Sequence, residues 1–463
     1  MKIVILAGGK SERLKPFYEK PLLKFCDKSL IQHQMEILFE AGARDYLIIG
    51  SEKNLEAIKI EAEKFAKTEV GVKLDFGKQI IDHGSAGALK SVNLEQFLCE
   101  GKDEGVLIVS SNDILELPAY TGLLNAVEKN PGTSVIVGQK VTSYFPGGYL
   151  MINSNDELLK IVEKPGPGNE PSDLINIVVH YHPSAEQLMK FVLEANSQTD
   201  DIYEVALDNM IGTGYKIKVS HYVGKWQPIK FPWHIYDAAK ILFEKEVRVR
   251  LKKGLPLIAG NLEKASSAIV KGEVIIEPGV KIFENSVVAG PAYLGANTVV
   301  ANNSLVRESF LGAGSVAGFA TEIARSYLGE KVWTHSNYIG DSVIGSNVSF
   351  GAGTVTGNLR LDEADVKILV KDQRVDSGRQ KMGLFMGNNV RCGINVSFMP
   401  GVKVGAGSMI GAGIVIAKDV EEKKFVSGEM GDIIVKDNLT EISDNREELM
   451  KKLCINESQK SQL

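Results

Sequence analysis

The first 245 residues alternate short apolar runs with segments of helical spacing. Residues 30–41 place apolar side chains at helical intervals and end at Gly42. The continuous apolar runs between such segments are residues 3–6, 46–49, 106–109 and 134–137. Runs of this length, bounded by turn residues, are typical of strands in a parallel sheet covered on both faces. The pattern predicts an α/β, Rossmann-like domain with a mostly parallel mixed sheet over residues 1–245.

A six-residue period replaces this pattern after residue 270. Glycine directly follows the apolar position in many of the hexads. The unbroken series of apolar positions is Met386, Cys392, Phe398, Val404, Ile410 and Ile416. In such a repeat each hexad forms one face of a triangular coil, with its apolar residue inside and a small residue at the corner. The period predicts a parallel β-helix over residues 271–436.

Three segments lie outside these two patterns. Residues 246–270 predict a helical linker between the domains. Residues 357–383 are charged and out of phase with the hexads, and we expect this insertion to project from one face of the coil. Residues 437–463 are polar and charged, and they predict a short helix followed by a disordered tail.

Charge and composition narrow the possible functions. Lys and Arg number 53 against 58 Asp and Glu, a net charge of −5, which argues against a nucleic-acid-binding surface as the main function. No apolar run approaches the ~20 residues of a membrane span. The stretch at residues 1–9 is too short for a signal peptide. The four cysteines have no metal-ligand spacing, so we expect reduced thiols, a cytoplasmic location, and neither nucleic acid nor membrane as a partner.

A glycine-rich segment follows the first apolar run directly. Gly8 and Gly9 would let the backbone N–H groups approach a phosphate, and Arg13 and Lys20 add positive charge nearby. A plain tight turn would account for the two glycines equally well. Lys20-Pro-Leu-Leu extends the pattern, and so does Gln79, five residues before Gly84 in Gln-Ile-Ile-Asp-His-Gly-Ser-Ala-Gly-Ala-Leu.

Together with Gly-Gly-Tyr at 147–149 and Val-Glu-Lys-Pro at 162–165, this set resembles the sugar-1-phosphate nucleotidyltransferases over residues 1–240. The resemblance implies that a sugar-1-phosphate attacks the α-phosphorus of a nucleoside triphosphate and that pyrophosphate leaves. It implies UTP or dTTP, since one glutamine pairs with uracil or thymine, and a Mg²⁺ ion. The implied nucleotide-binding residues are Ala7, Gly8, Gly9, Gln79, Gly84 and Ser85. The implied catalytic, metal and sugar residues are Arg13 and Lys20, Asp113, and Gly148, Glu163, Lys164 and Asn176. A solvated Lys164 and a capping Asp113 remain alternatives.

Two departures from the family pattern bear on activity. Ser11-Glu12 replace a usual Gly-Thr, which brings an anionic Glu12 close to a triphosphate. The family also carries a second metal-binding aspartate in a Trp-x-Asp segment. Here that segment reads Trp226-Gln-Pro, and Pro228 cannot ligate a metal through its side chain. A degenerate nucleotidyl domain therefore remains open.

His335 is the candidate residue for chemistry on the β-helix, in Trp-Thr-His-Ser-Asn-Tyr. Histidine titrates near neutrality and can accept the proton of an amine that attacks a thioester, although a structural histidine is the alternative. With Tyr338 and Asn358, the run resembles the acetyltransferase half of the bifunctional N-acetylglucosamine-1-phosphate uridyltransferase/glucosamine-1-phosphate acetyltransferases, above all archaeal-type members. The resemblance implies a left-handed β-helix, a homotrimer, acetyl-CoA as co-substrate and His335 as the base. It implies substrate contacts from Tyr338, Asn358 and Lys367.

These motifs support a bifunctional enzyme of sugar nucleotide biosynthesis that takes a nucleoside triphosphate, a sugar-1-phosphate and acetyl-CoA. UDP-N-acetylglucosamine is the expected product, and dTDP-glucose is also compatible with the first half. An acetyltransferase with a degenerate nucleotidyl domain is an alternative, as is its reverse. A non-catalytic regulatory or scaffold subunit that binds sugar nucleotides is the third possibility. The motifs leave the nucleobase and the sugar open.

Overall fold

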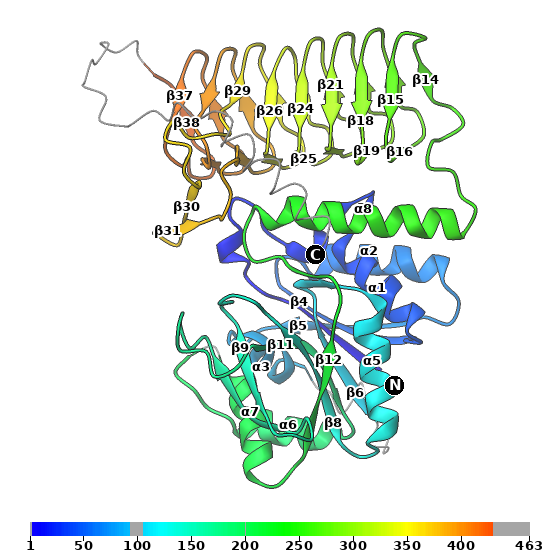
Figure 1. The fold of residues 1–463 in the computed structure, drawn as a ribbon, viewed down its shortest axis with the longest axis vertical. Coiled ribbons are helices and arrows are strands. Elements are labelled where there is room, and N and C mark those ends of the chain that lie inside the picture. The colour runs from blue at the N-terminus through cyan, green and yellow to red at the C-terminus, as the bar shows by residue number, and fades with distance from the viewer. Residues whose placement is uncertain (1, 93–104, 200, 429–463) are drawn as a thin grey trace. The chain divides into compact units, whose positions relative to one another are not determined.

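The computed structural model describes residues 2–92, 105–199 and 201–428, which form two compact units (Figure 1). The first unit comprises Met1–Lys10, Glu19–Leu23 and Lys28–Pro228, and the second comprises Ser11–Tyr18, Lys24–Asp27 and Ile229–Leu463. The units thus divide at Pro228, whereas the sequence places a domain boundary near residue 245. The predicted helix and disordered tail at 437–463 lie outside the described residues.

The first unit is built on a nine-stranded mixed sheet in the order β10-β9-β11-β6-β1-β4-β5, with β8 and β12 extending from β11. Four neighbouring strands pair in parallel: β1 (Lys2–Ala7), β4 (Asp45–Ser51), β5 (Lys73–Gln79) and β6 (Val106–Ser110). The others are β8 (Ser134–Lys140), β9 (Gly148–Ile152), β10 (Leu158–Glu163), β11 (Leu174–His182) and β12 (Ile217–Tyr222). The four apolar runs predicted as strands are β1, β4, β6 and β8, so the prediction is confirmed.

Helices cover both faces of this sheet, which explains why the runs at residues 3–6 and 106–109 are apolar at every position. Ile3 and Ile5 of β1 pack in one core, while Val4 and Leu6 pack in another. The first core includes residues of α1 (Leu30–Glu40), α2 (Leu55–Thr68) and α5 (Leu117–Lys129). The second includes α3 (Gly84–Lys90), α6 (Ala185–Glu194) and α7 (Ile202–Gly212). The short elements are η1 (Glu12–Leu14), η2 (Lys20–Leu22), β2 (Lys24–Phe25), β3 (Lys28–Ser29), β7 (Asp113–Leu115) and β13 (Trp226–Pro228).

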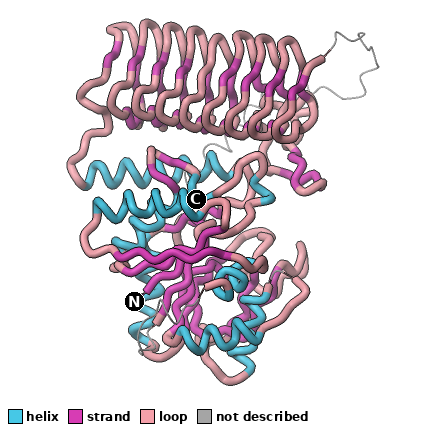
Figure 2. The backbone as a smooth tube through the Cα atoms, turned by 180° about the vertical axis from the view of Figure 1, so that it is seen from behind, coloured by secondary structure: helices cyan, strands magenta, loops and turns pink. Residues whose placement is uncertain are grey.

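The second unit is a β-helix whose short parallel strands stack into three faces (Figures 1 and 2). One face has eight strands: β15 (Ile269–Lys271), β18 (Val287–Ala289), β21 (Leu305–Arg307), β24 (Glu322–Ala324), β26 (Tyr338–Gly340), β29 (Val355–Thr356), β34 (Ser397–Phe398) and β37 (Val415–Ile416). The next has seven: β16 (Val274–Ile276), β19 (Ala292–Leu294), β22 (Phe310–Leu311), β25 (Tyr327–Leu328), β27 (Val343–Ile344), β32 (Phe385–Met386) and β35 (Lys403–Val404).

The third face consists of two four-stranded sheets. The first contains β14 (Glu263–Lys264), β17 (Lys281–Ile282), β20 (Val299–Val300) and β23 (Val316–Ala317). The second contains β28 (Ser349–Phe350), β33 (Arg391–Cys392), β36 (Met409–Ile410) and β38 (Phe425–Val426). All six apolar residues of the predicted hexad series lie in the single core inside the coil. The predicted β-helix is confirmed.

Two further elements belong to the second unit. Helix α8 (His234–Lys252) buries a row of apolar residues, and Phe243 packs its ring 5.6 Å from that of Phe310. Within residues 357–383, β30 (Lys367–Val370) and β31 (Gln373–Asp376) form an antiparallel hairpin that projects from the coil (Figure 1). Among the described residues, no helix has the length and apolar character that crossing a bilayer requires.

Candidate active sites

The glycine loop and the glutamine predicted to read the base lie side by side in the first unit. β1 and β5 both pair in parallel with β4, so their carboxyl ends meet at one edge of the sheet. A Cβ atom added to Gly8 would lie 2.1 Å from Oε1 of Gln79, so a larger residue there would displace the Gln79 amide. The Gln79 amide donates to the carbonyls of Ile81 at 3.0 Å and Gly84 at 3.4 Å. The structure thus brings Gly8, Gln79 and Gly84 together.

Lys20 bonds to the residue that precedes Asp113, just after the end of β6. The Lys20 ammonium donates to Oδ1 of Asn112 at 3.3 Å. The buried Gln34 amide donates to the carbonyls of Ser110 and Asp113, each at 3.1 Å, and so fixes the backbone on which Asp113 is carried. The Trp226 indole N–H donates to Oδ1 of Asp113 at 2.9 Å, which orients the carboxylate.

The antiparallel pair β7–β13 places Pro228 directly opposite Asp113. The position where a second carboxylate would face Asp113 therefore holds a proline. Among the described residues, no three His, Cys, Asp or Glu side chains are grouped to hold a metal. Mg²⁺ is commonly held by one or two carboxylates together with substrate phosphates and water. The donor set fits a Mg²⁺ ion that arrives with the triphosphate, and it does not fit a site made of protein ligands alone.

The four predicted sugar-binding residues form one cluster. Gly148 at the start of β9 pairs with Glu163 at the end of β10. A Cβ atom on Gly148 would lie 2.9 Å from Oε2 of Glu163 and 3.6 Å from Cβ of Asn176, so glycine leaves room for the two polar side chains. Lys164 pairs with Oε1 of Glu163 at 2.5 Å, and its backbone N–H donates to the carbonyl of Gly147 at 3.1 Å.

Arg13 belongs to the second unit, in the segment Ser11–Tyr18. It lines a cavity of about 750 Å³ together with Lys371 of the hairpin and Lys403 of the coil. Glu12, which departs from the family pattern, pairs with Lys15 at 3.0 Å. Its negative charge is therefore compensated within the same short segment.

His335 is exposed at a corner of the coil. The third face narrows there to single bridges between Trp333 and its neighbours Val316 and Ser349. The backbone N–H of His335 donates to Oδ1 of Asn337 at 2.5 Å, and the buried Asn337 amide donates to two carbonyls of the next coil at 2.9 and 3.0 Å. Asn337 thus holds the turn that carries His335.

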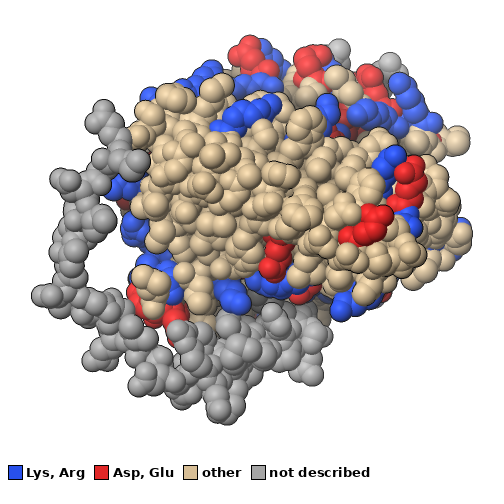
Figure 3. Space-filling model, turned by 90° about the horizontal axis from the view of Figure 1, so that it is seen from above, with Lys and Arg blue, Asp and Glu red and all other residues tan. Residues whose placement is uncertain are grey.

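Figure 3 shows that the face seen from above carries a broad area without charged side chains, with charges gathered toward its edges.

Tyr338 and Asn358, both predicted from sequence, are joined by a hydrogen bond. The Asn358 amide donates to the Tyr338 hydroxyl at 3.0 Å and to Oδ2 of Asp341 at 2.5 Å. Arg325 in turn grips Asp341 through two bonds of 2.7 and 2.8 Å. These bonds, with the charge of Asp341, raise the pKa of Arg325 against the opposing effect of burial. Sequence reasoning missed Arg325 and Asp341, although their separation equals one turn of the coil, as the pairing of Ala324 with Gly340 shows.

Lys367 begins β30 and its side chain is exposed. In the part of the chain that the structure describes, neither Lys367 nor His335 donates a side-chain hydrogen bond to the cluster of Arg325, Tyr338, Asp341 and Asn358. The hairpin segment is instead tied to α8 by an ion pair between Arg379 and Asp237.

Comparisons with known proteins agree with this division of the chain. The family model described as nucleotidyl transferase matches residues 2–227, which defines the first unit as a domain of that class. The bifunctional sugar-1-phosphate nucleotidylyltransferase/acetyltransferase of Sulfurisphaera tokodaii is 32% identical over 431 residues, covering 92% of this chain and 99% of the relative. Bifunctional GlmU proteins of Methanocaldococcus jannaschii and Methanococcus vannielii are 31% and 32% identical, covering 92% of this chain and 97% of each relative. The chain belongs to this family of bifunctional nucleotidylyltransferases/acetyltransferases.

Proposed function

We propose that the chain catalyses two steps of sugar nucleotide synthesis. One transfers acetyl from acetyl-CoA to an amino-sugar-1-phosphate, and the other transfers a nucleotidyl group from UTP or dTTP to a sugar-1-phosphate with release of pyrophosphate. The observation that carries the proposal is that both predicted constellations occur in one chain that matches bifunctional relatives over 97–99% of their length.

In the first unit, the nucleotidyl step requires positioning and charge neutralisation rather than a covalent intermediate. The backbone at Gly8 and Gly9 would hold the leaving phosphates, and Gln79 would read the base. Lys20 would neutralise charge at the α-phosphate as the sugar phosphate oxygen attacks in line. Asp113, oriented by Trp226, would hold the Mg²⁺ ion. When bound, that ion supplies neutralisation of the developing phosphate charge.

The sugar would lie against the cluster at the ends of β9 and β10. Glu163 can accept hydrogen bonds from sugar hydroxyls, and Asn176 can contribute an amide contact. Lys164, whose ammonium lies beside Glu163, can reach the sugar phosphate. Gly148 leaves the space that a side chain would fill.

In the second unit, the amine of the acceptor would attack the thioester carbonyl. A C–N bond forms, the C–S bond breaks and coenzyme A leaves as a thiolate, while His335 takes the proton lost by the amine and returns it to the departing thiolate, giving the thiol. Tyr338 and Asn358 would hold the substrate, and Lys367 would meet its phosphate.

His335 is an exposed corner residue, which favours a site completed by a neighbouring subunit of a homotrimer. Light scattering should give three times 50.4 kDa, and a monomeric mass would count against the trimer. We place the protein in the cytoplasm, in keeping with the buried free cysteines Cys26 and Cys392.

His335→Ala tests the assignment of the two activities to separate sites. We expect acetyl transfer, followed as thiol release from acetyl-CoA, to fall at least ~100-fold, because general-base catalysis contributes on that scale. Pyrophosphate release by the first unit should not change. His221→Ala, which removes an exposed histidine bonded to Asp156, is the matched control. Undiminished acetyl transfer in His335→Ala would remove His335 as the base.

An acetyltransferase with a degenerate nucleotidyl domain is the second candidate, and the proline opposite Asp113 favours it. It predicts thiol release from acetyl-CoA without pyrophosphate release. A regulatory subunit would instead bind sugar nucleotides and give neither product.

A further inference from the structure

A chain of buried polar side chains runs through the first unit and ends at Asn176. His180 of β11 bonds through Nε2 to Oδ1 of Asn176 at 2.8 Å and through Nδ1 to the Tyr203 hydroxyl at 3.1 Å. His182 bonds through Nε2 to the same hydroxyl at 3.3 Å and through Nδ1 to Oγ of Ser134 at 3.1 Å. Both histidines are completely buried and Tyr203 is 1% exposed. Buried polar groups are costly unless each is satisfied, and here every link has its partner.

An irregularity in β11 makes the first link possible. In the pairing with β8, Ile177 lies opposite Val137 and His180 lies opposite Ile136, so β11 advances three residues while β8 advances one. Bulges of this kind shorten a strand locally and redirect its side chains. The ring of His180 can therefore reach the amide of Asn176, four positions earlier.

The orientation of the Asn176 amide determines the direction of every bond. With Oδ1 of Asn176 against Nε2 of His180 at 2.8 Å, as the structure has it, Nε2 carries the proton and Nδ1 accepts from the Tyr203 hydroxyl. The Tyr203 oxygen then accepts from Nε2–H of His182, whose Nδ1 accepts from Ser134. Burial lowers the pKa of both rings, that of His182 to about 3, so both are neutral at pH 7 as this arrangement requires.

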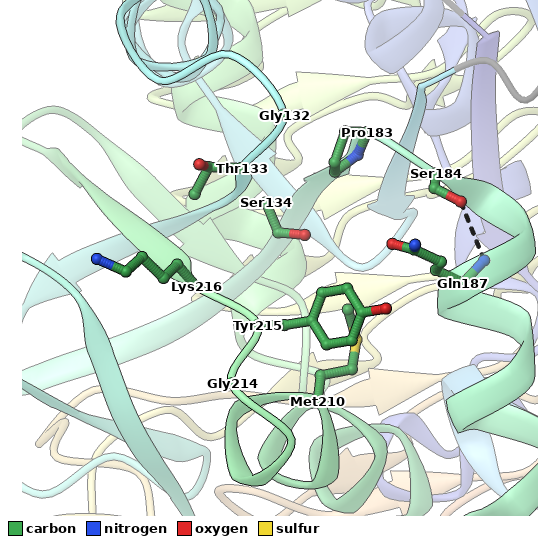
Figure 4. A pocket seen from close by; sticks show the side chains of 10 residues that line it. All are labelled: Gly132, Thr133, Ser134, Pro183, Ser184, Gln187, Met210, Gly214, Tyr215 and Lys216. Atoms are coloured by element: carbon green, nitrogen blue, oxygen red, sulfur yellow. Dashed lines mark hydrogen bonds between the residues drawn. The ribbon is translucent and has the colours of Figure 1, made fainter.

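The far end of the chain lies at a second cavity. Ser134 lines a pocket of about 270 Å³ with residues of α6, α7 and the loops beside them, and its hydroxyl points toward the middle of these side chains (Figure 4). The chain therefore joins the wall of this pocket to the predicted sugar site.

We propose that His180 and Tyr203 are positioning residues that fix the Asn176 amide with its oxygen toward His180 and its NH₂ group toward the sugar. Asn176 then presents only donors and selects a hydrogen-bond acceptor on the substrate, such as a hydroxyl or carbonyl oxygen. This inference rests on the proposed function, in which Asn176 contacts the sugar. Without the Tyr203 hydroxyl, Nδ1 of His180 loses its hydrogen-bond partner, and the ring can change tautomer. The Asn176 amide can then turn over, and in the turned orientation its oxygen would face the acceptor on the substrate.

Steady-state kinetics with Tyr203→Phe tests the inference. We expect KM for the sugar-1-phosphate to rise about fivefold to tenfold, the scale of one misdirected hydrogen bond, with KM for the nucleoside triphosphate unchanged. Tyr181→Phe is the matched control, because Tyr181 follows His180 in β11 and its side chain lies on the other face of the strand. It should change neither KM value. His180→Phe should raise KM for the sugar at least as much, and His180→Gln, which keeps a donor and an acceptor, should restore it. Equal KM values for Tyr203→Phe and the parent protein would overturn the proposal.

Imidazole ¹⁵N NMR provides a test that does not depend on turnover. In the full-length protein with labelled histidine, His180 and His182 should both show neutral rings protonated on Nε2 at pH 7, assigned through His180→Gln and His182→Gln. Tyr203→Phe should disturb the His180 pattern. A ring protonated on Nδ1 would refute the direction of the chain. If the tautomers are as expected but no pyrophosphate is ever released, the proposed function fails while the positioning chain stands.

Discussion

Acidification should destabilise the first unit through His180 and His182. Both rings are fully buried and neutral in the folded protein, and burial lowers the pKa of each below the ordinary value of 6.5. The unfolded chain takes up these protons near pH 6.5 while the folded chain does not. Stability is therefore complete above pH 6.5 and falls as the pH drops below it, until the folded pKa is reached.

The magnitude follows from the two pKa values of His182, 6.5 unfolded and about 3 folded. Between pH 7 and pH 5 only the unfolded state titrates, so this ring alone lowers the free energy of unfolding by about 2 kcal/mol. His180, whose pKa also lies well below 6.5, should add a similar amount. The pair should thus remove about 4 kcal/mol, a large part of the roughly 5–15 kcal/mol of a typical domain.

Urea unfolding at a series of pH values measures this loss. Replacing Trp233 and Trp333 by Phe leaves Trp226, in the first unit, as the only tryptophan that reports the transition. The comparison is between this protein and a version with His182→Gln added. Between pH 6 and pH 4 the free energy of unfolding should fall with decreasing pH in both proteins. The fall should be smaller in the His182→Gln variant, by about 1.4 kcal/mol per pH unit. Identical slopes in the two proteins would refute the reasoning.

Two further substitutions test the sites themselves. Trp226→Phe removes the 2.9 Å bond to Asp113. We therefore expect half-maximal pyrophosphate release to need about fivefold more Mg²⁺. An unchanged Mg²⁺ titration would contradict the role of Trp226 in orienting Asp113. Asp341→Asn breaks the paired bonds from Arg325 and weakens the hydrogen bond from the Asn358 amide. We therefore expect kcat/KM for acetyl transfer to fall at least ~10-fold, while pyrophosphate release is unaffected. Loss of both activities together would indicate general unfolding instead.

The strands and the coil were predictable because their signals are local. Residues 3–6 and 106–109 are apolar at every position because both sheet faces are covered, and the hexads ending at Ile416 keep one phase because each apolar side chain enters the same core. Tyr338 and Asn358 were predicted together from their motif, and the structure joins them by a hydrogen bond.

The polar networks behind the sites could not be predicted in the same way. Asp341 meets Arg325 only because one turn of this coil contains 16 residues, a length that the hexad period of 6 does not give. The bond from His180 to Asn176 depends on the irregular pairing of β11 with β8, for which the sequence has no local signal. The pairing of Glu12 with Lys15 likewise depends on a short turn of η1 rather than on a motif.

Product formation by the purified full-length chain with Mg²⁺ shows whether the chain carries both activities. Pyrophosphate release is measured for UTP, dTTP, CTP, GTP and ATP, each with glucose-1-phosphate and with N-acetylglucosamine-1-phosphate. Thiol release from acetyl-CoA is measured with glucosamine-1-phosphate in the same preparation. We expect both products, with UTP or dTTP as the preferred nucleotide. Thiol release without pyrophosphate from any pair would contradict this expectation and identify an acetyltransferase whose nucleotidyl domain no longer acts.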